Sequence, residues 1–60
     1  MILEKRIANN LSQSDVALAL GVSQQAVSLW ETGAREPPID KLIAMSELFN
    51  CTIDELLKGG

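Results

Sequence analysis

The stretch SQSDVALALGVSQQAVSLWETG, residues 12–33, decides the fold of this 60-residue chain. Ser12 is a good N-cap, and apolar residues at helical spacing follow it as far as Gly21, which tolerates the positive φ of a helix end. Ser23 caps a second helical pattern, and Gly33 closes it. The stretch therefore predicts two short helices joined by a tight turn at Gly21.

A further helix is predicted before this stretch, at residues 2–8. There Leu3 and Ile7 lie four residues apart and form a short apolar stripe. Asn9 and Asn10 break the pattern, and either can adopt the left-handed conformation that ends a helix.

Two more helices are predicted after residues 34–38, where two prolines favour a loop. The first extends from Ile39 to Phe49, and Thr52 with Glu55 forms a capping box for the second. Lys58 then lies favourably at the negative end of the last helix dipole. The apolar residues of both helices are expected to face the core: Ile39, Leu42, Ile43, Met45, Leu48, Phe49, Leu56 and Leu57.

Length and composition confine the chain to one domain, residues 1–60, with a small aliphatic core. The hydrophobic fraction is 47%, but only Trp30 and Phe49 are aromatic, which suits short helices better than a sheet. No apolar run approaches the roughly 18 residues of a membrane span, and no signal-peptide pattern opens the chain. We expect an all-α, compact five-helix bundle in the cytoplasm, with no membrane contact.

The reactive side chains argue against an enzyme. The chain has no histidine, and its acidic residues are not clustered as paired acid–base catalysis requires. Cys51 stands alone, which excludes an internal disulfide and favours a small packing residue. We expect no cofactor, no metal ion and no small-molecule substrate.

Two adjacent glutamines, Gln24 and Gln25, stand in the first turn of the second helix of the pair. Glutamine forms a bidentate pair with adenine, and the first turn of the second helix in a helix-turn-helix reaches base edges. One turn further, Ser28 offers a hydroxyl and Leu29 a contact for a thymine methyl group. The pattern predicts that helix 24–32 reads the major groove of double-stranded DNA; the alternative is a solvated polar first turn.

Three other side chains are candidates for the phosphate backbone: Gln13, Ser23 and Arg35. Gln13 opens the first helix of the pair, beside an N-terminus that favours anions. The Ser23 hydroxyl can face a phosphate as well as cap its helix. Arg35 can reach a phosphate or a minor groove, or it can pair with Glu36.

The net charge of −3 indicates weak non-specific DNA binding, because phosphate neutralisation supplies that part of the affinity. It also favours a second hypothesis, an antitoxin-like or adaptor protein that uses the same fold to hold a protein partner. The adjacent glutamines favour DNA.

Six segments follow one another in a characteristic order and spacing: KRI at 5–7, LSQ at 11–13, VALALGVS at 16–23, QQAVSLWETG at 24–33, REP at 35–37 and CTIDELLKG at 51–59. Together they resemble the lambdoid phage repressor and Cro-like (XRE-type) helix-turn-helix family, above all the N-terminal domains of phage repressors. The resemblance covers nearly the whole chain. It implies a compact five-helix fold whose third helix lies in the major groove.

For the site, the resemblance implies base reading at Gln24, Gln25 and Leu29. It implies phosphate contacts at Gln13 and Thr32. Leucine at position 29 departs from the polar residue that is common there, which weakens hydrogen-bond readout at that position.

The resemblance further implies a salt bridge between Arg6 and Glu31, which orients the reading helix and whose rupture leaves one charge unpaired. It implies a transcriptional repressor that forms a homodimer through its C-terminal helix and binds half-sites about 34–36 Å apart. The first helix begins at Met1, so we expect no N-terminal arm on the DNA.

Overall fold

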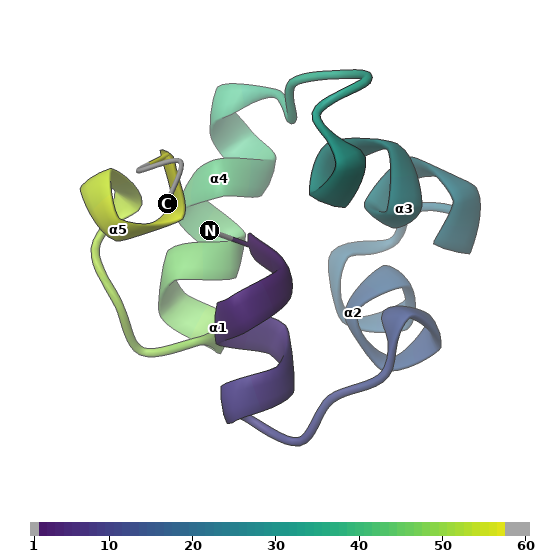
Figure 1. Cartoon of the computed structure of the whole chain (residues 1–60). Helices are drawn as coiled ribbons and strands as arrows, with labels where there is room; N and C mark the ends of the chain where they lie inside the picture. The colour runs from purple at the N-terminus through teal and green to yellow at the C-terminus, as the bar shows by residue number, and fades with distance from the viewer. Residues whose placement is uncertain (1, 58–60) are drawn as a thin grey trace.

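The computed structural model describes residues 2–57, and these form five helices around one core (Figure 1). The helices are α1 (Ile2–Ala8), α2 (Gln13–Leu20), α3 (Gln24–Thr32), α4 (Ile39–Leu48) and α5 (Ile53–Leu57). Figure 1 shows α2 and α3 together on one side of the molecule and α4 and α5 on the other, and both pairs are in contact. The predicted all-α bundle is confirmed over these residues. Lys58 lies outside them.

Local signals place most helix ends where the sequence predicts, but α4 ends at Leu48 rather than at Phe49, which is its C-cap. The Ser12 hydroxyl accepts a hydrogen bond from the Asp15 amide at 3.0 Å, and the Asp15 carboxylate accepts one from the Ser12 amide at 2.9 Å. Hydrogen bonding with Ser12 lowers the pKa of Asp15, and the bond from the Ser12 backbone amide has the larger effect. Asn10 and Asn50 have φ values of 58° and 53°, so each ends a helix in the left-handed region.

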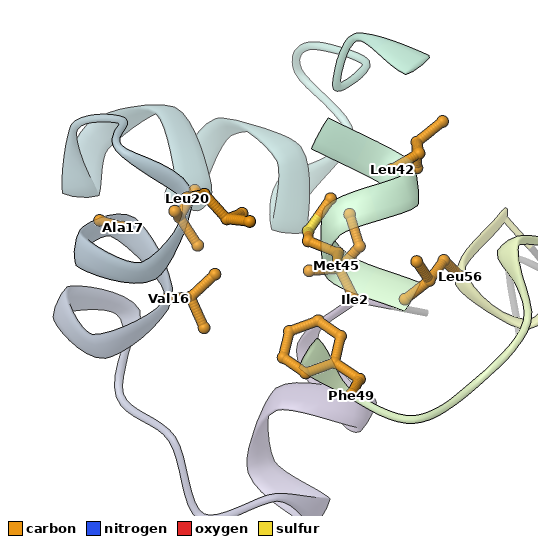
Figure 2. Packing of buried hydrophobic residues seen from close by; sticks show 9 residues of the cluster. Ile2, Val16, Ala17, Leu20, Leu42, Met45, Phe49 and Leu56 are labelled. Atoms are coloured by element: carbon orange, nitrogen blue, oxygen red, sulfur yellow. The ribbon is translucent and has the colours of Figure 1, made fainter. Parts of the chain in front are cut away.

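The core is aliphatic apart from one phenylalanine, and Figure 2 shows its side chains converging around Met45. Met45, Val16 and Val27 are completely buried. Leu11, Trp30 and Cys51 are among the partly buried residues that pack against it, so the predicted packing role of Cys51 is confirmed. The buried residues are Ile2, Val16, Ala17, Leu20, Val27, Leu42, Met45, Phe49 and Leu56.

Three residues that were expected to face the core do not. Ile39 is 65% exposed and Ile43 is 47% exposed, because the face of α4 that meets the core is narrower than predicted and carries Leu42 and Met45. Leu57 is 60% exposed while Leu56 is buried. Successive helical residues point about 100° apart, so two adjacent leucines of one short helix cannot both enter the core.

The apolar stripe of α1 is also turned outward. Ile2 is buried, whereas Leu3 and Ile7 are exposed. An ion pair of 2.8 Å between Lys5 Nζ and Glu55 Oε2 joins α1 to the first turn of α5. No helix among residues 2–57 has the length and apolar character to span a membrane.

Candidate nucleic-acid interface

A three-residue turn fixes the start of α3 against α2. Gly21 has a φ of 69°, and its amide donates to carbonyl groups in the last turns of α2. A Cβ added at Gly21 would meet no atom within 4 Å, so the backbone conformation rather than crowding favours glycine here. Ser23 then caps α3 by accepting a hydrogen bond from the Ala26 amide at 3.1 Å.

Only one residue of α3, Val27, is buried. Gln24 and Gln25 are exposed at its first turn, and Ser28 and Leu29 are half-buried one turn later. The structure therefore brings all four sequence-predicted base-reading residues onto one helix, with its two amides toward solvent.

An ion pair joins α1 to the last turn of α3. Arg6 Nε donates to Glu31 Oε2 at 2.5 Å, and the two side chains are only 15% and 5% exposed. Arg6 also donates through Nη1 to the carbonyl oxygen of Leu11 at 2.9 Å. The ion pair implied by the family resemblance is thus present, and its low exposure means that either charge alone lacks solvation.

The ion pair continues into a chain of side-chain hydrogen bonds that ends at α2 and α3. Gln13 Nε2 donates to Glu31 Oε1 at 2.7 Å, and Gln24 Nε2 donates to Gln13 Oε1 at 3.4 Å. Ser14 Oγ donates to Gln24 Oε1 at 3.0 Å. Ser14 was missed by sequence reasoning, because its contact lies ten residues away on another helix and has no spacing signal.

The candidate phosphate residues differ in how far their polar groups are already engaged. Gln13 uses one amide hydrogen on Glu31, and Ser23 accepts a bond while its own hydroxyl hydrogen remains. Thr32 Oγ1 donates to the carbonyl oxygen of Leu29 at 3.2 Å. Arg35 is exposed and forms no ion pair with Glu36 within the described part of the chain.

Most positive charges of residues 2–57 are neutralised by neighbouring acids. Lys41 lies 3.7 Å from Asp40 and donates to the carbonyl oxygen of Leu20, so it also closes the end of α2. The hydrogen bond from Lys5 is the main cause that lowers the pKa of Glu55 to about 2, and the same bond raises the pKa of Lys5.

A groove of about 480 Å³ opens at the C-terminal end of α3, beside Trp30, whereas the glutamines lie at the N-terminal end. Four helices and the loop after α3 line it. Its apolar part includes Trp30, Leu42 and Leu57, and its polar part is formed by Glu31, Thr32, Arg35 and Glu36. Residues 2–57 contain no group of histidine, cysteine and acidic side chains that could hold a metal ion.

The family described as helix-turn-helix matches residues 2–56. The HTH-type transcriptional activator BcrR of Enterococcus faecalis is 44% identical over 54 residues, which are 90% of this chain and 26% of that protein. The uncharacterized HTH-type transcriptional regulator YqaE of Bacillus subtilis (strain 168) is 37% identical over 54 residues, 90% of this chain and 47% of that protein.

Repressor protein C2 of Salmonella phage P22 is 36% identical over 58 residues, which are 97% of this chain and 27% of that protein. The chain thus spans about a quarter to a half of the length of these relatives. No solved structure gives a significant match.

Proposed function

The chain belongs to the helix-turn-helix family, and we propose that it is the DNA-reading domain of a transcriptional regulator, with α3 in the major groove. The observation that carries this function is the pair of exposed amides, Gln24 and Gln25, at the first turn of a capped helix. In this class of domain, that turn meets the base edges. In this proposal, binding to DNA is sufficient for regulation and takes place in the cytoplasm. It requires no catalytic step, cofactor or small-molecule substrate.

A selection of random duplex DNA by the 60-residue chain at low salt, followed by sequencing, tests this function. We expect an enriched motif, with two inverted half-sites one helical turn apart if the chain binds as a dimer. A folded chain that enriches no sequence would contradict DNA reading. That result would favour the antitoxin-like or adaptor role, for which the neutralised cations are the supporting observation.

The contacts with the phosphate backbone of DNA are assigned in this proposal to Gln13, Ser23, Thr32 and Arg35. Ser23 and Gln13 retain a polar hydrogen for a phosphate oxygen, and Arg35 supplies the positive charge. With one unpaired cation in the described part of each chain, few counterions are released on binding. The salt dependence of the affinity is therefore expected to be shallow.

We expect Gln24→Ala to weaken binding to the selected motif by about 1–3 kcal/mol, because a bidentate adenine contact is lost. The loss should be confined to one base pair of each half-site, at which the variant no longer discriminates. Titrations against the motif and its single-base variants measure this. Gln25→Ala is the matched comparison and should relax a different base pair. An equal loss on every sequence would contradict base reading by Gln24.

The regulator is further proposed to act as a homodimer through its C-terminal end. The apolar groove beside Trp30 and the exposed side chain of Leu57 on its rim support this assignment. A second copy that covers Leu57 and the apolar part of the groove, and leaves Thr32 and Arg35 open to DNA, would remove this apolar surface from water, which is the main driving force of association. Two copies would also double the number of base pairs read.

Leu57→Ser is expected to shift the chain from dimer toward monomer and to weaken binding to the two-half-site motif, while a single half-site is bound as before. Leu18→Ser is the matched control, because Leu18 is 85% exposed on α2 and lines no part of the groove. Sedimentation equilibrium measures the association. If both serine variants dimerise as the unchanged chain does, the groove is not the interface.

We propose repression as the mode of regulation, since a domain bound across a promoter excludes polymerase with no further contact. The relatives include both a named activator and a named repressor. A reporter with the selected motif placed over the promoter, or upstream of it, separates the two modes. Lower transcription from the first arrangement supports repression, and higher transcription from the second contradicts it.

A further inference from the structure

The direction of the Gln24 amide is fixed by a carboxylate two side chains away. Glu31 can only accept hydrogen bonds, so the amide nitrogen of Gln13 faces it and the amide oxygen of Gln13 faces Gln24. That oxygen requires a donor, so Gln24 turns its own nitrogen toward Gln13. The oxygen of Gln24 is then left on the opposite flank, where it accepts the hydroxyl hydrogen of Ser14.

These contacts occupy only part of the hydrogen-bonding capacity of the Gln24 amide, and the rest is available to a base. A primary amide has two donor hydrogens and two acceptor lone pairs. Gln13 and Ser14 engage one of each. One donor and one acceptor remain, and this is the combination that pairs with N7 and the N6 amino group of adenine.

We propose that Ser14 is a positioning residue for base reading, which holds Gln24 in the orientation that selects adenine without contacting the base itself. This inference rests on the proposed function of α3. The hydrogen bond that Gln24 accepts from Ser14 is the shorter of its two flanking bonds, at 3.0 Å, against 3.4 Å for the one that Gln24 donates to Gln13. Ser14 is therefore the stronger tether of the amide.

Ser14 has no evident structural task beside this contact. It is exposed, and the N-cap of α2 is Ser12 rather than Ser14. Gln24 is exposed as well, so without a tether its flexible side chain would sample several rotamers in water. Glutamine is among the side chains that lose most rotamer freedom when they are fixed, so we expect the tether to improve adenine binding by about three- to tenfold.

The test compares Ser14→Ala with Ser14→Thr, which keeps the hydroxyl. Each is titrated against the selected motif and against the motif changed at the base pair that Gln24→Ala relaxes. Ser14→Ala should weaken binding to the motif by about three- to tenfold and leave binding to the changed sequence as it was. Its thermal midpoint should not fall, and Ser14→Thr should restore the preference.

A double-variant cycle separates positioning from other roles. In a Gln24→Ala background, Ser14→Ala should have no further effect, because the tether has nothing to hold. A uniform loss on all sequences would overturn the inference in favour of a phosphate contact by Ser14. If Gln24→Ala relaxes one base pair and Ser14→Ala changes nothing, the inference about Ser14 is overturned while the proposed function of α3 stands. If the unchanged chain prefers no sequence, the proposed function and this inference both fail.

Discussion

Replacement of Glu31 by alanine is expected to cost about 3–5 kcal/mol of folding free energy, because it leaves the Arg6 guanidinium poorly solvated and without its charge partner. A 60-residue domain has a total stability of only about 3–9 kcal/mol. A large fraction of Glu31→Ala chains should therefore be unfolded at 25 °C. Urea titration followed by far-ultraviolet circular dichroism measures the loss.

Two controls identify the cause of this loss. Asp40→Ala removes an exposed acid from its 3.7 Å pair with Lys41, and surface pairs of this kind contribute little. The double variant Arg6→Met with Glu31→Leu removes both charges, so it should recover much of the stability that Glu31→Ala alone loses. If the double variant is less stable than Glu31→Ala, the unpaired charge is not the cause.

Met45→Ala should cost about 2–5 kcal/mol, because Met45 is completely buried at the centre of the core and its removal leaves a cavity. Met45→Leu, which nearly conserves volume, should cost less than about 1.5 kcal/mol. The same urea titration measures both variants.

Ile43 supplies the matched control, since it lies on the same helix but is 47% exposed. Ile43→Ala should cost much less than Met45→Ala. Equal losses at the two positions would contradict the face of α4 that is described above.

The order of the helices could be predicted because their ends are chemically marked. Ser12 and Ser23 are caps whose hydroxyls accept the expected amides, and Gly21 and Gly33 have the positive φ that glycine tolerates. Such signals involve neighbours within about one helical turn, so they can be read before any tertiary contact is known.

The orientation of the helices could not be predicted to the same accuracy. Periodicity marked Ile39, Ile43 and Leu57 as core residues because they are apolar, yet short helices in a small bundle bury only a narrow stripe each. Which stripe is buried depends on the partners of the helix. For α4 and α5 these include each other, and the sequence pattern does not specify that packing.

The candidate site shows the same division. Gln24 and Gln25 are predicted as reading residues from their place after a cap, whereas the ion pair of Arg6 with Glu31 was implied only by the family resemblance. The hydrogen bond from Ser14 to Gln24 joins two helices across ten residues and depends on how they pack. No local pattern predicts such a contact.

The single buried residue of α3 has a consequence for inheritance. Val27 is the only buried residue of α3, whereas Gln24 and Gln25 at its first turn are exposed, and most substitutions at such surface positions change stability by less than about 0.5 kcal/mol. Under the proposed function, a descendant of this gene can therefore acquire a new operator by point mutation at Gln24 or Gln25 and still fold. Paralogues with separate targets can arise from one ancestor through changes to a few codons.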